Sequence, residues 1–349
     1  MLEFPTLSTD VSYGRIQDSL NEKTFFYPST PEKSNHNELI KILNEPVFST
    51  DGGFYSDSLH LKLTCEEDNI NIYYTLDCTE PTENSILYTG GDILIDSTTV
   101  IRSKVFKEKC YPSKIVSNTY IYNKPEEISI CSIVVDPILF NDSINGILSP
   151  MNLTNIEIPA TFSYWDVNPN MNYKSDIGLR LHGNYARTLP QKPFRLTSRS
   201  NYEKNEFEFD FFENKSLKKY KWLVLHNGSN DWQKTLIRND FSTILAKILS
   251  GKGAPYSKQV ITYLNGKYYG IMHLMERIDE DYLSDIYDIK ENTVNYLRDY
   301  HLIQSGTGKE YSYMYDKLIN LEMNDDSSFE KINEFIDIDN LIDYTFLEN

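Results

Sequence analysis

Between residues 46 and 123 the chain runs as short segments in which apolar and polar side chains alternate. The clearest are LHLKLTC (59–65), INIYYTL (70–76), TVIRSKVF (99–106) and SNTYIY (117–122). Alternation with a period of two places the apolar side chains on one face of a β-strand. Turn-forming breaks, such as DGG at 51–53 and CTEPTENS at 78–85, separate these segments at the spacing of a sandwich. The pattern therefore predicts an all-β domain over 46–123.

A second pattern begins at residue 128 and mixes strands with a helix. The strand-like segments are ISICSIVV (128–135), ATFSYWDV (160–167), GLRLHG (178–183), KPFRLTS (192–198), YKWLVLH (220–226), QVITYLNG (259–266) and YYGIMHLME (268–276). The Asn-Gly pair at 265–266 is typical of a hairpin turn between the last two. This mixture predicts an α+β domain, with two short amphipathic helices in the tail FEKINEFIDIDNLIDYTFLEN.

The helix in this second pattern is predicted over residues 231–250. Its apolar positions include Leu236, Phe241 and Leu245, which share roughly one helical face, and Gly251 follows as a stop. Asp231 stands at the start, where a carboxylate that accepts backbone N–H bonds is favoured as an N-cap. We therefore interpret Asp231 as a cap and not as a catalytic base.

Length and charge limit the classes of function. A chain of 349 residues favours two domains with connecting segments. With 34 Lys and Arg against 51 Asp and Glu, the net charge of -17 argues against general binding to nucleic acid or anionic membranes. No run of 18 apolar residues predicts a membrane span, and the first residues do not resemble a secretion signal. The compartment stays open, with an extracellular or surface location suspected for a longer parent protein.

The four cysteines predict no metal site. Cys65, Cys78, Cys110 and Cys131 show neither the CxxC spacing nor the paired histidines of a zinc site, while disulfides between them remain open. His226 and His273 stand in or at the end of apolar strands and are interpreted as structural.

The window GLRLHGNYARTLPQKPFRLTSRS, at 178–200, departs from the acidic composition of the chain. It contains Arg180, Arg187, Lys192, Arg195 and Arg199 and no acid. Cations around a flexible connection between two strands could neutralise a polyphosphate, as the glycine-rich loop and strand lysine do in kinases. The alternative is a set of solvated arginines on an edge hairpin.

Two segments resemble modules of multidomain surface proteins. PVFSTDGGFYSDS, IYYTLDCTEPT and SKIVSNTYIY resemble the chitobiase/β-hexosaminidase C-terminal-like module, an immunoglobulin-like sandwich that serves as a spacer or binds glycans. Cys78 stands where that family usually has Gly, so a turn with positive φ is expected to be mildly strained there. In the irregular segment 1–45, SYGR and STPEKSN resemble the final strand and exit loop of a lamin-tail-like domain.

The cationic window, together with LHNGSNDWQKTLIRNDFSTILA and YLNGKYYGIMHLMERIDEDYL, resembles the CotH kinase family of spore-coat-protein-H-like atypical protein kinases. The resemblance implies that cofactor-binding positions fall on the following residues: Arg180, Gly183, Lys192, Arg238, Asn239 and Glu276. His182 replaces the family's usual Arg before Gly183, which is expected to weaken one phosphate contact. Lys192 is expected to reach the α- and β-phosphates of ATP while Glu276 orients it through an ion pair.

Taken together, the sequence predicts an irregular segment (1–45), a β-sandwich (46–123) and an α+β atypical kinase-like domain (128–349). The resemblance implies ATP with Mg²⁺ or Mn²⁺ as cofactors and Ser or Thr of a cell-surface or spore-coat protein as acceptor. The family's catalytic and metal-binding acids are expected after residue 349, so no catalytic or metal residue is assigned and the domain is expected to be truncated and inactive. The alternative is a non-catalytic surface protein whose sandwich binds glycans.

Overall fold

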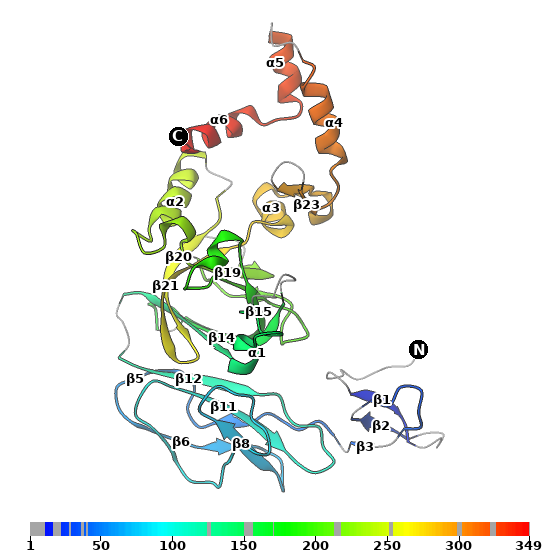
Figure 1. Cartoon of the computed structure of the whole chain (residues 1–349), viewed down its shortest axis with the longest axis vertical. Coiled ribbons are helices and arrows are strands. Elements are labelled where there is room, and N and C mark those ends of the chain that lie inside the picture. The colour runs from blue at the N-terminus through cyan, green and yellow to red at the C-terminus, as the bar shows by residue number, and fades with distance from the viewer. Residues whose placement is uncertain are drawn as a thin grey trace. The chain divides into compact units, whose positions relative to one another are not determined.

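The computed structural model divides the chain into two compact units (Figure 1). The first consists of Met1–Leu153, Ala160–Lys174 and Thr262–Tyr269; the second consists of Thr154–Pro159, Ser175–Ile261 and Gly270–Asn349. The structure describes residues 11–16, 22–27, 29–35, 38–39, 41–123, 127–149, 156–169, 171–212, 218–250, 254–298, 302–321 and 326–348. Within these ranges, no helix has the length and apolar character needed to cross a membrane. The domain boundaries proposed from the sequence stay a prediction.

The segment predicted to be irregular, 1–45, contains a small antiparallel sheet, which corrects that prediction. Its strands, in the order β1-β2-β3, are Ser12–Arg15, Lys23–Phe26 and Glu38–Leu39. Tyr13 and Phe25 face each other across the first pair, with ring centroids 5.2 Å apart, and Phe26 is fully buried. Strands of two to four residues show too few alternations to be recognised in a sequence, and aromatic packing stabilises them here.

A β-sandwich-like module follows, as predicted. A five-stranded sheet in the order β5-β12-β11-β8-β9 is accompanied by the pairs β10-β6 and β4-β7. The strands are β4 Val47–Phe48, β5 Gly53–Tyr55, β6 Leu59–Leu61, β7 Leu63–Thr64, β8 Asn71–Thr75, β9 Ile86–Leu87, β10 Ile93–Ile95, β11 Thr99–Phe106 and β12 Val116–Tyr122. Leu61, Ile101 and Tyr120 are fully buried in one hydrophobic cluster, so both layers of strands share a core.

Cys78 adopts a positive φ of 67°, as its replacement of a family glycine led us to expect. Its carbonyl oxygen accepts a hydrogen bond from Arg102 Nη1 at 2.6 Å, which holds the turn in place. All four cysteines are free thiols in the structure, and burial raises the pKa of the Cys78 thiol to about 11. The strained turn is therefore stabilised by a buried arginine and not by a disulfide.

The remaining strands form a barrel and two short ribbons. The barrel order is β13-β14-β15-β16-β19-β21-β20. Its strands are β13 Ser129–Val135, β14 Ile158–Trp165, β15 Asn172–Leu181, β16 Phe194–Thr197, β19 Trp222–His226, β20 Ser257–Leu264 and β21 Lys267–Glu276. The ribbons pair β17 (Phe207–Glu208) with β18 (Lys219–Tyr220), and β22 (Tyr296–Arg298) with β23 (Leu302–Ser305). Each barrel strand overlaps one of the predicted strand segments.

Six α-helices lie among the described residues. They are α1 Pro137–Asn141, α2 Arg238–Ser250, α3 Glu280–Tyr287, α4 Lys309–Leu318, α5 Asp326–Asn333 and α6 Ile338–Glu348, with 3-10 turns at Tyr185–Thr188, Ser229–Asp231 and Glu291–Thr293. The last two helices confirm the predicted amphipathic pieces, and α6 contacts α2 (Figure 1).

The start of the long helix was wrong in the prediction, because α2 begins at Arg238 and not at residue 231. Asp231 is buried and accepts hydrogen bonds from the backbone N–H groups of Thr235 and Arg238. Positive φ angles at Gln233 and Leu236 break the helical path between them. Asp231 thus acts as the predicted acceptor of backbone N–H bonds, but through a turn that precedes the helix. The predicted stop at Gly251 lies outside the described residues.

The predicted Asn-Gly hairpin is present between β20 and β21. Asn265 and Gly266 have φ angles of 52° and 73°, the left-handed conformation that a two-residue type I′ turn requires. Asn265 Oδ1 also accepts a hydrogen bond from the backbone N–H of Val135 at 2.8 Å. One side chain therefore sets the turn and ties it to β13.

Replacing Asn265 by Ala is expected to destabilise the fold by about 1–2 kcal/mol, since it removes the acceptor for Val135 and the preference for positive φ. Urea unfolding followed by circular dichroism would measure the change in midpoint. Asn265→Asp is the matched control, because it keeps the acceptor and tolerates the turn. Equal midpoints for Asn265→Ala and wild type would contradict the assignment.

Candidate functional site

Four antiparallel strands of the barrel, β15-β16-β19-β21, carry different side chains on their two faces. Directly paired residues share a face, and the pairings place Leu196, Leu223 and Glu276 in one row, with Arg195, Val224 and Met275 in the next. Because alternate residues point to opposite faces, the leucines form one buried face. The opposite face carries cations and histidines, and we call it the cationic face: Arg180, His182, Arg195, Trp222, His226, His273 and Arg277.

Two arginines lie against one indole on the cationic face, and a third arginine is paired with one of them. Arg180 pairs directly with Arg195 across β15 and β16. The guanidinium carbons of Arg195 and Arg277 lie 5.8 and 4.7 Å from the ring centroid of Trp222. We call Arg180, Arg195, Arg277 and Trp222 the arginine cluster. Burial, followed by the charges of Arg180 and Arg277, lowers the pKa of Arg195 to about 9, so this guanidinium is held in an environment that disfavours its charge.

Few acids compensate the arginine cluster. Glu157 Oε1 lies 3.5 Å from Arg199 Nη1, and Glu157 also accepts hydrogen bonds from Thr197 and Tyr202. Asp279 Oδ2 lies 3.5 Å from Arg277 Nη1. These two carboxylates face several cations, so the cluster carries an excess of positive charge.

Histidines occupy the other end of the cationic face. His226 Nδ1 accepts a hydrogen bond from the backbone N–H of Gly228 at 3.2 Å and lies 3.3 Å from Asn239 Nδ2. Burial lowers the pKa of His226 to about 4 and that of His182 to about 3. With Nδ1 as acceptor and a low pKa, His226 is neutral near pH 7 and carries its proton on Nε2, where it can donate.

His273 joins the start of α2 to the barrel. Its Nδ1 lies 2.9 Å from Asp240 Oδ2, while Ser257 donates to Asp240 Oδ1 at 2.6 Å. Burial opposes ionisation of Asp240, but the bonds from His273 and Ser257 hold its pKa below the ordinary value. Because the serine bonds the aspartate and not the histidine, this arrangement positions α2 and does not match a nucleophilic triad.

The loop between β15 and β16 is held by its own cations and by one amide. Gly183 has a φ of 71°, which turns the chain out of β15. Lys192 Nζ donates to the carbonyl oxygen of Arg187 at 2.8 Å, and Arg187 Nη2 donates to that of Leu181 at 3.2 Å. Asn227, fully buried, donates from Nδ2 to two further carbonyl oxygens of the loop, those of Ala186 and Gln191.

The structure does not bring Lys192 to Glu276, the pair expected to orient phosphates. Glu276 is in the same strand row as Leu196, and Lys192 precedes Leu196 by four residues. At a rise of about 3.3 Å per residue, the two are separated by roughly 13 Å along the strands. Glu276 is buried and accepts a hydrogen bond from the backbone N–H of Tyr256 at 2.7 Å. Its role in the structure is to hold β20 against β21.

The other predicted positions are distributed along the cationic face. Arg180 lies in the arginine cluster, while Gly183 and Lys192 lie in the loop at the opposite end. Asn239, on α2, reaches His226, and the Arg238 side chain is 60% exposed with Nε 4.0 Å from Asp231. Arg180 thus lies near Arg195 and Arg277, and Asn239 lies near His226. The sequence prediction did not group these residues.

Sequence reasoning missed Arg195, Trp222 and Arg277 as site residues. Arg195 stood in the acid-free window, but it was not assigned a role of its own. The usable signal was alternation: with β16 and β19 aligned, Arg195 and Trp222 fall on the same face. Arg277 directly follows β21, so placing it on this face requires knowledge of the register between β19 and β21.

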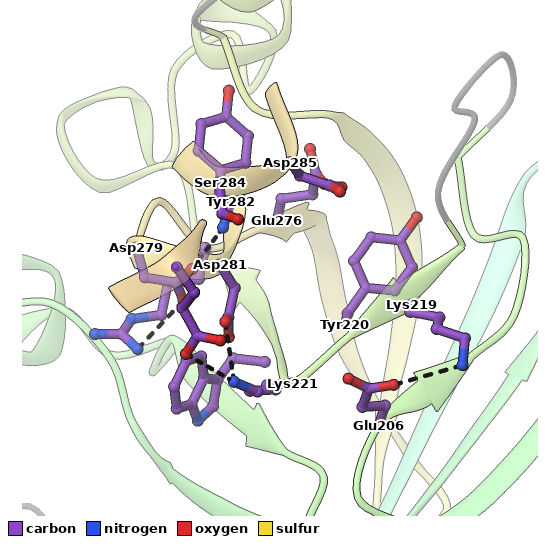
Figure 2. A pocket seen from close by; sticks show the side chains of 13 residues that line it. Glu206, Lys219, Tyr220, Lys221, Glu276, Asp279, Asp281, Tyr282, Ser284 and Asp285 are labelled. Atoms are coloured by element: carbon purple, nitrogen blue, oxygen red, sulfur yellow. Dashed lines mark hydrogen bonds and ion pairs between the residues drawn. The ribbon is translucent and has the colours of Figure 1, made fainter. Parts of the chain in front are cut away.

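A pocket of about 200 Å³ adjoins Trp222 and Arg277 (Figure 2). Lys221 Nζ bonds both Asp281, at 2.9 Å, and Glu291, at 3.1 Å, and the pocket is also lined by Glu206, Glu276 and Asp285. Asp279 caps α3 by accepting the N–H of Tyr282 at 3.0 Å. In the described parts of the chain, no group of three or more His, Cys, Asp or Glu side chains is arranged to hold a metal ion.

Asp279 is expected to make stability depend on pH. It is 3% exposed, and burial raises its pKa to about 6, although Tyr282 N–H and Arg277 oppose the rise. A carboxyl group whose pKa is higher in the folded state stabilises the protein below pH 4, and this contribution is lost as the pH rises through 6. A shift of two units corresponds to about 3 kcal/mol.

Asp279→Asn keeps a side-chain oxygen for the cap and removes the buried charge. We therefore expect its stability relative to wild type to increase between pH 4 and pH 7, by up to about 3 kcal/mol. Denaturant unfolding at both pH values would measure the difference. Asp288→Asn, at the exposed end of α3, is the control, and a pH-independent difference for Asp279→Asn would contradict the assignment.

Comparison with protein families adds the identity of both parts of the chain. Residues 50–118 match the model described as chitobiase/beta-hexosaminidase C-terminal domain, and residues 179–349 match the model described as CotH kinase protein. No curated protein matches the chain. The second match contains the whole loop, the arginine cluster and α2. Residues 179–349 therefore belong to the CotH kinase protein family, and a chitobiase/beta-hexosaminidase C-terminal domain precedes them.

Proposed function

We propose that the second unit binds ATP on the cationic face as part of a CotH-type atypical protein kinase, which phosphorylates Ser or Thr of a cell-surface or spore-coat protein. The observation that carries the proposal is the concentration of cations on one sheet face inside the matched region, in a chain of net charge -17. A polyphosphate is the common cellular ligand that such a face would attract.

The residues on this face fit a nucleotide in charge and in hydrogen bonding. The loop from Gly183 to Lys192 borders one end of the face, where His226 offers an Nε2 proton. At the other end, Trp222 provides an aromatic surface between two guanidinium groups. ATP, when bound, supplies the phosphoryl group that is transferred, with Mg²⁺ or Mn²⁺ as the expected metal.

Lys192 acts in this proposal by shaping the loop. Its bond to the Arg187 carbonyl oxygen holds the turn closed, so its loss would disturb the loop that borders the nucleotide. This differs from a direct contact between a lysine and the α- and β-phosphates, although both roles make Lys192 necessary for tight binding.

Isothermal titration of the chain with ATP and Mg²⁺ tests the proposal. Wild type is expected to bind, and Lys192→Ala to bind at least about tenfold more weakly, equivalent to about 1.4 kcal/mol. Lys62→Ala, an exposed lysine of the sandwich, is the matched control and should bind as wild type does. Failure of wild type to bind ATP would refute the proposal, as would equal affinities for wild type and Lys192→Ala.

A glycan-binding surface protein is the second candidate, supported by the match of residues 50–118. On the sandwich, the Tyr73 and Phe106 rings lie edge to face at 5.5 Å, and Lys104 Nζ lies 5.6 Å from the centroid of Phe106. All three side chains are partly exposed, as a sugar-stacking surface requires. Titration with chitin oligomers is expected to show binding that Tyr73→Ala weakens; an unchanged signal would leave the sandwich as a spacer.

A further inference from the structure

The arginine cluster holds more buried donors than the described residues satisfy. Arg180 Nε, Arg195 Nε and Trp222 Nε1 are buried and find no hydrogen-bond acceptor in the described part of the chain. Arg195 is 6% exposed, so water cannot readily replace the missing acceptors. An unsatisfied buried donor destabilises a fold, and more so when the group is charged. Such a cluster is therefore expected to have an acceptor-rich partner.

The charges around the cluster specify the sign of that partner. Four arginines lie close enough for the charge of one to lower the pKa of another: Arg180, Arg195, Arg199 and Arg277. Glu157 forms an ion pair with Arg199, and Asp279 forms one with Arg277. The adjoining pocket is also lined by Glu206, Glu276, Asp281, Asp285 and Glu291. Of these acids, Glu206 pairs with Lys219, and Asp281 and Glu291 pair with Lys221. Close guanidinium groups repel one another in a partly buried setting, and an anion between them would relieve the repulsion.

From this geometry we infer that the arginine cluster is a binding site for a phosphate group. A tetrahedral phosphate presents several acceptor oxygens to guanidinium N–H groups, with which it forms paired, charge-assisted bonds. Trp222 adds an indole N–H beside the two guanidinium groups that flank its ring. The inference rests on the proposed function only for the source of the phosphate, which is either a nucleotide or a separate phosphate-bearing ligand.

Two cavities reach the edge of the cluster at Trp222. Trp222 and Arg277 line the pocket of about 200 Å³ shown in Figure 2. On another side, Trp222 and Arg199 line a cavity of about 390 Å³ together with Ser198 and Ser200. Hydroxyl groups are additional donors that suit a phosphate oxygen.

The position of the cluster separates it from the loop. Trp222 and His226 are the ends of β19, so the cluster and the histidine end of the face are roughly 13 Å apart along the strand. A phosphate in the cluster is therefore distinct from a group bound against the loop of Gly183 and Lys192. A nucleotide long enough to reach both ends would occupy both positions.

Titration with inorganic phosphate, at constant ionic strength against chloride, tests the site. Phosphate is expected to raise the thermal midpoint of wild type, and Arg195→Gln to bind it at least tenfold more weakly. Arg15→Gln is the matched control, because this arginine is exposed on β1 and has no part in the proposed site. If Arg195→Gln does not fold, Trp222→Phe tests the site instead, because it keeps an aromatic ring but loses the indole N–H. This variant is expected to bind phosphate severalfold more weakly than wild type.

Equal responses of wild type to phosphate and chloride would overturn the inference, as would unchanged phosphate affinity in both folded cluster variants. Competition between ATP and phosphate would assign the site to the nucleotide, and simultaneous binding would assign it to a second phosphate-bearing ligand; both support the site. If phosphate binds while ATP does not, the proposed function fails and the phosphate site stands. If ATP binds, Lys192→Ala weakens ATP binding and phosphate does not bind, the proposed function stands and the phosphate site is refuted.

Discussion

The antiparallel register of β15, β16, β19 and β21 is the constraint on which the site depends. It aligns Leu196 with Leu223 on the buried face, and Arg195 with Val224 on the other. A shift of one residue in any strand would exchange these faces, burying guanidinium groups among leucines. The hydrophobic core and the cationic face are therefore two results of the same hydrogen-bond pattern, and neither can be kept if the register changes.

Much of the strand pattern could be predicted because alternation and turn residues are local signals. The Asn265–Gly266 turn and the positive φ of Cys78 followed from the residues at those positions. The start of α2 did not, since Asp231 captures backbone N–H groups as far as Arg238 through a turn with two left-handed residues, Gln233 and Leu236. A polar side chain that competes with the helix is hard to recognise when the apolar spacing already appears helical.

The site was only partly predictable for a different reason. Composition revealed that 178–200 is unusually basic, yet it could not show which cations meet. Lys192 turns to the Arg187 carbonyl oxygen, whereas Arg195 meets Arg277, a residue more than 80 positions away in the chain. Such meetings depend on strand pairing between distant segments, and one sequence contains no direct record of that pairing.

Asn227 holds the loop between Gly183 and Lys192 in one conformation, unlike a flexible lid. Its Nδ2 group bonds two carbonyl oxygens at separate points of the loop, and its Oδ1 accepts the N–H of Ser229, which leads toward α2. Opening the loop would leave the buried Nδ2 group of Asn227 without its two acceptors, which is unfavourable. The loop is thus preorganised. Binding of a ligand that fits it therefore costs the protein little conformational entropy.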